Sequence, residues 1–357
     1  MKLLFVINTM MGGGAARVTA LLCNELVKEN YQIVIATNLA THTIGYNLDS
    51  RIRTISIYSI NHNKDNKLLR FFYHVIKLRK AIKTIKPDII IGEQEDSIVY
   101  SVLAKSFMSI PVVGHRHNTF KILGLSRIQR VIFNSATITV LLHNTDFCYV
   151  GKKIKNKCVI YNPCSFLTNK IFQAQKKKQV IIVGSIDRWY NKGIDLMFAI
   201  WKCIEQNVND WKLIVVGSGN NENFNYILNL AKEKGIQENV VFTGYTNNVD
   251  DYLAQSAIFA LPSRVEGFPM VLNEAVSQGC ACISYELSGV VPELYSKESV
   301  VCVKDGDINL FVEKLVELMT NESLRDILSS NAIKELKKYS IENIARKWDS
   351  LFHDLKN

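Results

Sequence analysis

The chain has 357 residues, of which 48% are hydrophobic and 21% charged, a composition typical of a globular protein long enough for two domains with separate cores. The formal net charge of +10 is uneven, because residues 1–170 hold 23 Lys+Arg against 9 Asp+Glu (+14), whereas residues 171–357 hold 20 against 24 (−4). No apolar run approaches the roughly 20 residues that span a bilayer, and the first run, residues 3–7, is too short for a signal-peptide core. We therefore expect a cytoplasmic protein.

The first half begins as an α/β domain. The apolar run Lys2–Asn8 is followed by Gly12, Gly13 and Gly14 and then by apolar residues at helical spacing through Val27. Strand, glycine loop and helix in this order open a βαβ unit, so a mainly parallel sheet is expected. Further buried strands are predicted at Gln32–Thr37, Asp88–Gly92 and Pro111–Gly114.

The stretch 64–86 is strongly basic, with eight Lys and Arg residues against one acid, Asp65. Its apolar residues follow helical spacing, and aromatic residues widen that face: Leu68, Phe71, Phe72, Tyr73, Val75, Ile76, Leu78, Ile82 and Ile85. A basic amphipathic helix can lie on an anionic membrane surface, and the charge of the first half favours this interpretation. The alternative is an ordinary helix with a core-facing stripe and solvated lysines.

The second half repeats the plan. Strand-like runs occur at Gln179–Val183, Lys212–Val216, Val240–Thr243, Ala257–Leu261 and Ala281–Ser284, with helical patterns between them. We expect domains at residues 1–170 and 171–340, with a boundary between Asn162 and Lys178 and a linker around 171–178. The last helix, 341–357, has Ile344, Trp348, Leu351 and Phe352 on one face, and it packs either on its own domain or back on the first.

Ligands of open α/β sheets bind at the carboxyl ends of the strands. The glycine loop 12–14 offers backbone N–H groups to an anion, but it is not GxGxxG and no ribose-binding acid follows near Thr37, which disfavours a nicotinamide cofactor. Gly217–Gly219 and residues 242–245 are either nucleotide-binding loops or tight turns. In the loop after 179–183, Arg188 and Lys192 suit a diphosphate, unless they are solvated charges.

Two glutamates are the most informative feature. The strand at 257–261 breaks at Pro262 and Gly267, which places Glu266 on a loop and Glu274 one or two turns into the next helix. With the glycine loops, Arg17 and Lys192-Gly193, this arrangement resembles the retaining glycosyltransferases of family 4, of the bacterial surface-polysaccharide type. The resemblance implies the GT-B fold, in which two doubly wound, Rossmann-like domains face a central cleft.

The resemblance also implies roles. Glu274 would accept hydrogen bonds from the ribose hydroxyls, and Glu266 from the hydroxyls of the transferred sugar, because carboxylates are acceptors that take two hydroxyls at once. Lys192 would bind the diphosphate and stabilise the leaving group, without a metal. The implied donor site is Gly14, Ser185, Arg188, Lys192, Gly217, Gly244, Tyr245, Glu266, Gly267, Phe268, Met270 and Glu274, the last loop contributing backbone N–H groups.

One departure concerns the phosphate loop. The family usually has an arginine where this chain has Ser185, and the loop is longer by about two residues, so we expect Arg188 to supply the cation. On the first domain, His117 resembles the family histidine near the donor sugar and completes the implied catalytic set with Glu266 and Lys192. His115 is a rival, and the bland alternative for His117 is a loop histidine bonded to backbone.

Other acids have weaker claims. Asp305-Gly306-Asp307 matches the DxD of metal-dependent transferases, but a helical run follows it and Asp307 is expected to cap that helix. Glu93, Glu95 and Asp96 follow a strand and face either acceptor hydroxyls or water. The eight cysteines are scattered without a CxxC pair, which favours buried free thiols over disulfides or zinc.

The leading prediction is a retaining transferase that moves a hexosyl unit from a UDP-hexose or UDP-N-acetylhexosamine to a lipid-linked or lipopolysaccharide-type acceptor, at the inner face of the membrane. We expect front-face attack, with the departing phosphate taking the proton, and no cofactor. The alternatives are a sugar-nucleotide epimerase or another GT-B enzyme, or a basic nucleic-acid- or membrane-binding protein without catalysis. The basic residues form no recognisable nucleic-acid-binding motif, so no nucleic-acid partner is predicted.

Overall fold

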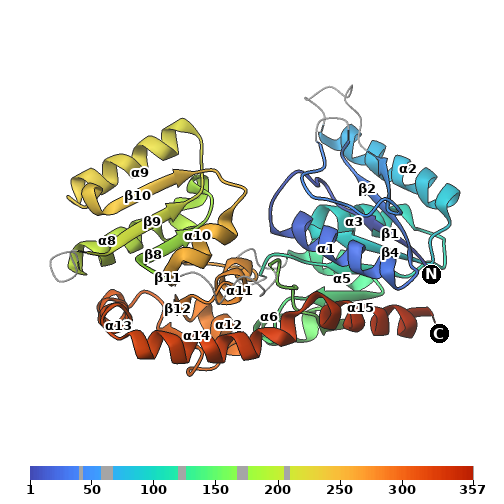
Figure 1. Cartoon of the computed structure of the whole chain (residues 1–357). Helices are drawn as coiled ribbons and strands as arrows, with labels where there is room; N and C mark the ends of the chain where they lie inside the picture. Colours follow the sequence, from blue (N-terminus) through green and yellow to red (C-terminus); the bar gives the residue numbers. More distant parts are fainter. Residues whose placement is uncertain (40–42, 58–66, 120–125, 167–175, 205–209, 357) are drawn as a thin grey trace. The chain divides into compact units, whose positions relative to one another are not determined.

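A computed structural model describes residues 1–39, 43–57, 67–119, 126–166, 176–204 and 210–356 (Figure 1). The chain divides into two compact units. Unit 1 comprises Met1–Pro163 together with Tyr339–Asn357, and unit 2 comprises Cys164–Lys338. Each unit is an α/β domain built on its own parallel sheet.

The sheet of unit 1 has the strand order β3-β2-β1-β4-β5-β6-β7, and each of its pairings is parallel. The chain turns in opposite directions from β1, towards β2 on one side and β4 on the other, which creates a switch point where ligands of such sheets bind. The strands are β1 (Lys2–Val6), β2 (Gln32–Thr37), β3 (Arg53–Ser56), β4 (Ile89–Glu93), β5 (Val112–His115), β6 (Ile138–Leu141) and β7 (Lys157–Val159).

Helices cover both faces of this sheet because its central strands are apolar on both sides. One core joins the sheet to α1 (Gly14–Lys28) and α15 (Ile341–Lys356), with Ile344, Trp348 and Phe352 buried in it. α15 packs against α1, which answers the question that its sequence left open. The other core lies under α2 (Lys67–Ile85), α3 (Gln94–Ala104), α5 (Arg127–Ser135) and α6 (Asn144–Val150).

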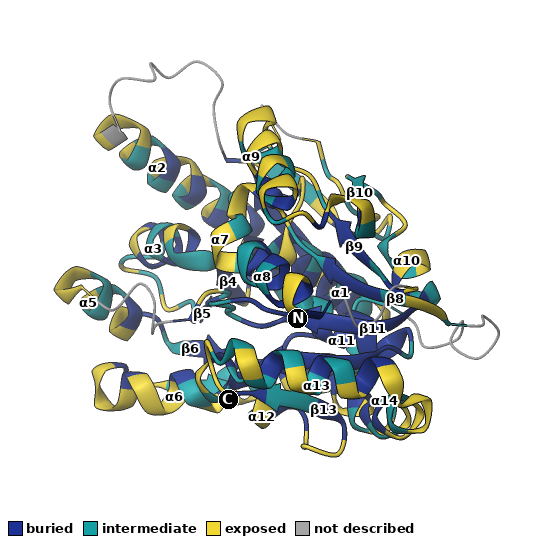
Figure 2. Cartoon of the chain, turned by 90° about the vertical axis from the view of Figure 1, so that its left-hand side faces the viewer, coloured by how far each residue is buried: buried dark blue, intermediate teal, exposed yellow. Residues whose placement is uncertain are grey.

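Unit 2 contains a six-stranded sheet of order β10-β9-β8-β11-β12-β13, again parallel. Its central strands are buried, whereas exposed residues gather on the outer sides of the helices (Figure 2). The strands are β8 (Lys177–Val183), β9 (Lys212–Val216), β10 (Val240–Gly244), β11 (Ser256–Leu261), β12 (Ala281–Tyr285) and β13 (Val300–Val303). The helices are α7 (Trp189–Lys192), α8 (Ile194–Ile204), α9 (Asn221–Glu233), α10 (Val249–Gln255), α11 (Met270–Ser277), α12 (Val290–Leu294), α13 (Ile308–Thr320) and α14 (Glu322–Leu336).

Three expectations need correction or completion. β8 begins at Lys177, so Lys177 and Lys178 belong to a strand and not to the predicted linker, whose residues 171–175 lie outside the described residues. Both lysines are exposed at the strand start, and Lys178 pairs with Asp210, which explains why this end has a polar sequence. All eight cysteines are free, but Cys148 and Cys203 are exposed. Within the described ranges, no helix has the length and apolar character needed to cross a membrane.

Candidate active site

The predicted site residues of unit 2 lie on the loops that follow β8, β9, β10 and β11 and at the start of α11. Gly193 ends α7 with φ +65°, and a Cβ there would lie 2.0 Å from the Pro262 carbonyl oxygen. Only glycine permits this close approach of the two loops. The Lys192 side chain runs beside Gly184, where a Cβ would lie 3.1 Å from Lys192 Cδ. Glycines therefore bring the lysine of one loop to the glutamate of the other.

Glu266 and Lys192 form the centre of this group. Lys192 Nζ donates to Glu266 Oε1 at 2.8 Å, and Ser263 Oγ donates to the same oxygen at 2.8 Å. The side chains are largely buried, with 19% of Lys192 and 10% of Glu266 exposed. The predicted diphosphate-binding cation and sugar-binding carboxylate thus contact each other.

Arg264, which the sequence analysis did not single out, holds the Glu266 loop in place. Its guanidinium donates to both carboxylate oxygens of Asp195 at 2.8 and 2.7 Å, and to the Tyr190 carbonyl oxygen at 2.6 Å. The guanidinium also lies over the Tyr190 ring, 4.0 Å from its centroid. The hydrogen bonds that Arg264 donates to Asp195 raise the pKa of Arg264, so this clamp between the loop, α7 and α8 keeps its charge.

Glu274 is the fifth residue of α11 and is buried, with 4% of its surface exposed. Nearby contacts fix the helix: Ser277 Oγ donates to the Glu274 carbonyl oxygen at 2.7 Å, and Tyr295 Oη donates to Asn273 Oδ1 at 2.8 Å. The loop that precedes α11 contains Gly267 and the buried Phe268. The Met270 N–H, predicted to help bind the sugar, donates to the Phe268 carbonyl oxygen at 2.8 Å.

The loops after β8, β9 and β10 are joined through their backbones. Gly184 N donates to Val216 O at 2.9 Å, and Gly217 N donates to Gly244 O at 3.1 Å. At Gly217, where φ is +144°, a Cβ would lie 1.9 Å from the Gly184 carbonyl oxygen. Gly217 is therefore required for the close approach of the loops after β8 and β9, whereas an added Cβ at Gly244 would meet no atom within 4 Å.

The remaining predicted residues of unit 2 are more exposed. Ser185 and Arg188 are exposed on the short turn that follows β8, and Tyr245 is 75% exposed, with its hydroxyl donating to Asn247 Oδ1 at 2.8 Å. Asp187, between Ser185 and Arg188, accepts hydrogen bonds from Asn220 N at 2.8 Å and Asn223 Nδ2 at 3.0 Å. These bonds tie the turn to the start of α9. The backbone next to Arg188 is therefore held in place, while the Arg188 side chain is exposed.

In unit 1, the glycine loop ends where α1 begins, at Gly14. Gly13 caps the helix with φ +90°, a conformation that favours glycine. Tyr46 Oη donates to the Gly13 carbonyl oxygen at 3.1 Å, and the Arg17 guanidinium lies 5.8 Å from the centre of the Tyr46 ring. The loop therefore leads directly into a helix N-terminus, and its contact with an anion stays a prediction.

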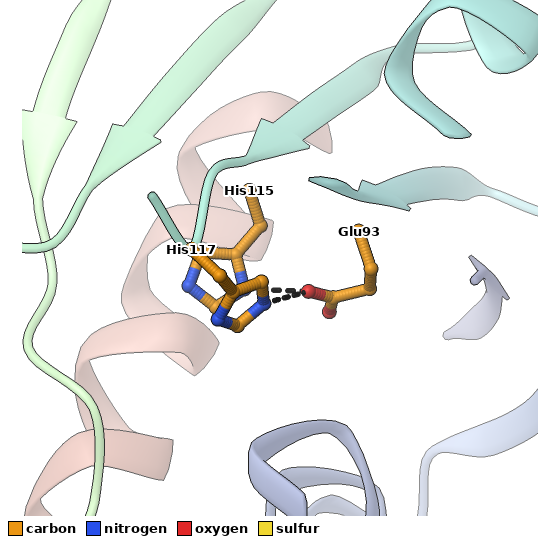
Figure 3. Close-up of side chains that lie close together, drawn as sticks. All are labelled: Glu93, His115 and His117. Atoms are coloured by element: carbon orange, nitrogen blue, oxygen red, sulfur yellow. Dashed lines mark hydrogen bonds and ion pairs between the residues drawn. The ribbon is translucent and has the colours of Figure 1, made fainter. Parts of the chain in front are cut away.

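The second group of unit 1 joins Glu93 to two histidines (Figure 3). Glu93 ends β4 and is paired in register with His115 at the end of β5. His117 Nε2 lies 2.5 Å from Glu93 Oε2, and His115 Nδ1 lies 2.9 Å from the same oxygen. Glu93 is fully buried, so the expectation that it faces acceptor hydroxyls or water is wrong. The alternative interpretation of His117 predicted a hydrogen bond to backbone. The structure shows a hydrogen bond to the Glu93 carboxylate instead.

The pKa values of this group follow from burial and from the mutual contacts. Burial acts to raise the pKa of Glu93, but the two histidines outweigh it and hold the pKa at about 2. Burial, helped by His115, lowers the pKa of His117. On α1, burial and the nearby Glu93 charge raise the pKa of Cys23. Glu93 is therefore an anion and His117 is neutral at pH 7.

The loop that contains His117 is held on both sides. Arg116 is buried and donates through Nε to Glu95 Oε1 at 2.7 Å, and Thr119 Oγ1 donates to Asp146 Oδ1 at 2.6 Å. Asp96 accepts a hydrogen bond from Asn8 Nδ2 at 3.4 Å. Glu95 thus supports the loop, whereas Asp96 is exposed to water.

Two sets of residues have metal-ligand chemistry. Both acids of the DxD sequence bind backbone: Asp307 caps α13 by accepting from Leu310 N at 3.0 Å, which confirms the predicted cap, and Asp305 accepts from Leu287 N at 2.8 Å. Among the described residues, the ligand atoms of Glu93, His115 and His117 lie within 4.8 Å of one another and could hold an ion. However, the 2.5 Å contact to His117 is a hydrogen bond, shorter than the about 3.3 Å that separates two ligands of one tetrahedral zinc.

Two parallel-sheet, Rossmann-like units with site residues at the carboxyl ends of their strands define the GT-B class of glycosyltransferase folds. The structure superimposes on sucrose-phosphate synthase from Thermosynechococcus elongatus with a TM-score of 0.84 at 16% identity, covering 99% of this chain and 98% of the other. Anabaena HepE in complex with UDP and glucose gives a TM-score of 0.80 at 16% identity, covering 99% of both chains. At these identities, the likeness concerns the fold.

The sequence carries the family assignment. The family described as Glycosyltransferase Family 4 matches residues 12–148, and Glycosyl transferases group 1 matches residues 166–335. The chain belongs to these glycosyltransferases. It is 27% identical over 355 residues to an uncharacterized glycosyltransferase of Haemophilus influenzae, covering 97% of this chain and 98% of the relative.

A second relative has a more specific name. The chain is 25% identical over 366 residues to GalNAc-alpha-(1->4)-GalNAc-alpha-(1->3)-diNAcBac-PP-undecaprenol alpha-1,4-N-acetyl-D-galactosaminyltransferase of Campylobacter jejuni, covering 100% of this chain and 99% of the relative. The group 1 match includes Lys192, Glu266 and Glu274, and the family 4 match includes Glu93 and His117.

Proposed function

We propose that this glycosyltransferase moves a hexosyl unit from a UDP-hexose or UDP-N-acetylhexosamine to a lipid-linked or lipopolysaccharide-type glycan acceptor, with retention of the anomeric configuration. The observation that carries the proposal is the contact between Lys192 and Glu266, supported by Ser263 on a loop that Arg264 clamps. The bond that breaks joins a diphosphate to a sugar. The Lys192 cation suits the diphosphate side of this bond, and the neighbouring Glu266 carboxylate suits the hydroxyls on the sugar side.

Each of the four charged site residues of unit 2 then has one role in the transfer. Lys192 stabilises the negative charge that develops on the departing diphosphate, and Arg188 supplies a second cation in place of the family arginine. Glu266 accepts hydrogen bonds from the transferred sugar, and the buried Glu274 accepts them from the ribose. With two cations at the diphosphate, we propose that transfer requires no metal. The acceptor hydroxyl attacks on the side that the diphosphate leaves, and the departing phosphate takes the proton.

The choice of substrates rests on the relatives. The Anabaena structure contains UDP and glucose, and the Campylobacter relative is named for transfer of N-acetylgalactosamine to an undecaprenol diphosphate glycan. The basic charge of residues 1–170 supports the same choice, because it suits an acceptor that carries a diphosphate.

The test is a donor and acceptor matrix. Purified protein is incubated with UDP-glucose, UDP-galactose and their N-acetylated forms, with GDP-mannose as the control donor, and with undecaprenyl diphosphate glycans as acceptors. Nucleotide release and product mass report transfer, NMR of the product reports the anomeric configuration, and EDTA tests the metal. Release from none of the UDP donors, or an inverted product, would contradict the proposal.

We also propose that α2 binds an anionic membrane surface. Within the basic stretch 64–86, residues 64–66 lie outside the described residues. The C-terminal part of the predicted stripe, Leu78, Ile82 and Ile85, is buried in the core. A separate set on α2 is exposed: Leu68 and Leu69 at 64%, Phe72 at 52% and Ile76 at 65%. An exposed apolar row beside exposed lysines is the pattern of an interfacial helix.

Vesicle co-sedimentation tests the membrane proposal. Wild-type protein should bind vesicles that contain phosphatidylglycerol at low salt, and the variant Phe72→Glu/Ile76→Glu should bind them weakly. Because Phe72 and Ile76 are exposed, the variant should keep its thermal stability. Equal binding of both proteins, or no binding by the wild type, would contradict the assignment of this surface.

A further inference from the structure

Glu93 has no assigned task in the transfer reaction, although it is the most deeply buried acid near His117. Glu93 is the last residue of β4, and the register of β4 with β5 places His115 opposite Glu93. His117, two residues later, returns to the same carboxylate oxygen, so that the two imidazole rings lie with centroids 4.1 Å apart. An oxygen contacted by two rings restricts the orientation of both.

The hydrogen bond fixes which nitrogen of His117 carries the proton. An ionised carboxylate only accepts hydrogen bonds, so the 2.5 Å contact requires a proton on His117 Nε2. In the neutral ring, Nδ1 is then the acceptor. A protein without Glu93 would leave this choice of tautomer open.

The other nitrogen of His117 lacks a partner. Nδ1 is buried and has no hydrogen-bond partner among the described residues. A buried acceptor without a donor is costly, and it marks a position where a ligand group can supply the missing donor. A hydroxyl of a sugar substrate supplies such a donor.

The surroundings prevent His117 from satisfying Nδ1 by turning. Arg116 and Thr119 anchor the loop on either side through Glu95 and Asp146. His115 occupies the space beside the ring and is itself packed edge-on against Trp348 of α15, with centroids 4.9 Å apart. The ring is therefore held by its hydrogen bond, by its neighbour and by its loop.

We propose that Glu93 is a positioning residue for transfer, which holds His117 with Nε2 protonated and Nδ1 as the acceptor for a hydroxyl of the substrate. The role of the hydroxyl rests on the proposed function, whereas the tautomer does not. The carboxylate itself does not touch the substrate, and its effect passes through the histidine.

The tautomer can be measured without substrate. Nitrogen-15 NMR of histidine-labelled full-length protein should show His117 protonated at Nε2. Glu93→Gln should give a mixture of tautomers, because an amide both donates and accepts, while the control Asp96→Asn should match the wild type. A wild-type His117 protonated at Nδ1, or an unchanged tautomer in Glu93→Gln, would overturn the proposal whether or not the protein transfers sugar.

Turnover distinguishes positioning from a purely structural role. Glu93→Gln should lower kcat about 10- to 100-fold, the usual loss when the partner that orients a functional histidine is removed, with the KM for the donor nearly unchanged and UDP affinity intact. A rise in KM with kcat unchanged would overturn the role in transfer. Circular dichroism of each variant separates these results from unfolding.

The pH dependence of kcat gives a further test, because its acid limb should shift in opposite directions in two variants. The titratable groups around His117 are Glu93, His115 and Glu95, with Cys23 of α1 beside Glu93. Glu93 raises the pKa of His117 and His115 lowers it. The acid limb of kcat should therefore move to lower pH in Glu93→Gln and to higher pH in His115→Asn. Shifts in the same direction would contradict the arrangement.

A metal ion in the same place is the competing explanation. Elemental analysis of protein purified without chelator decides between them. The proposal expects no stoichiometric zinc, manganese or iron. Stoichiometric metal in the wild type that is lost in Glu93→Gln would overturn it, because Glu93 would then act as a ligand and not as the orienting partner of His117.

Discussion

Units 1 and 2 each place a carboxylate against a basic group at the end of a parallel sheet, but the two carboxylates differ in their access to solvent. Glu266 and Lys192 remain 10% and 19% exposed on loops, so a ligand can reach either partner. Glu93 is fully buried and His117 only 6% exposed. The partly exposed pair, Lys192 and Glu266, can exchange its mutual contact for contacts to a substrate. The buried pair, Glu93 and His117, keeps its contact, so Glu93 can act on a substrate only through His117.

The strongest test of this contrast is Lys192→Ala. Removing a cation that stabilises developing charge should lower kcat by about 10²- to 10³-fold, or about 2.7–4 kcal/mol. Steady-state kinetics with the preferred UDP-sugar measures the effect, and Lys232→Ala on α9 is the control. A variant that keeps more than half of the wild-type kcat would remove Lys192 from the chemistry.

Acid unfolding tests the buried carboxylate. Because the pKa of Glu93 is about 2 in the folded chain against an ordinary 4.5, its contribution is complete above about pH 4.5 and is lost as the pH falls towards 2. The contribution is on the order of 3 kcal/mol. The lowered pKa of His117 acts in the same direction below its ordinary pKa of 6.5. Urea unfolding from pH 7 to 3 should show a steeper loss in the wild type than in Glu93→Gln, and parallel curves would contradict this assignment.

The two glutamates of unit 2 should separate nucleotide binding from transfer. Glu274→Ala should weaken UDP binding by about 1.5–3 kcal/mol, the range for hydrogen bonds to a charged group. Glu266→Ala should leave UDP affinity close to that of the wild type and still abolish most transfer. Calorimetry with UDP and kinetics with the UDP-sugar measure the two effects. Loss of UDP affinity in both variants would show that the division between ribose and sugar is wrong.

Arg188→Ala should have the smallest effect, because its side chain is exposed on a turn. We expect a loss of about tenfold in kcat/KM, which corresponds to about 1.4 kcal/mol. Arg188→Lys should recover part of it, since the charge is retained. Near-normal turnover of Arg188→Ala would mean that another cation replaces the family arginine.

The sequence was most informative where buried strands are long and apolar. The predicted strands at 32–37 and 212–216 coincide with β2 and β9, because continuous apolar runs between turns admit few alternatives. The strands β3, β6, β7 and β13, of three or four residues each, were not predicted, whereas β5, equally short, was predicted from its apolar run bounded by Pro111 and Gly114. Such short segments carry too few residues for a periodic pattern.

For the site, the sequence indicated which residues have suitable chemistry but not which of them meet. Lys192 and Glu266 are 74 positions apart, and the clamp between Arg264 and Asp195 joins residues 69 positions apart. Glu93 was visible as an acid after a strand, but its orientation depends on the register of β4 with β5. Contacts of this kind come from tertiary packing, which local sequence patterns do not contain.

The placement of α15 has a consequence for the order of synthesis. Unit 1 contains the first 163 residues and also Tyr339–Asn357, and Trp348 of α15 packs against His115. A ribosome therefore completes the whole of unit 2 before it releases the helix that finishes the core of unit 1. During translation, the histidine pair therefore stays without its aromatic cover until α15 emerges, and the core of unit 1 is completed only after unit 2 has been made.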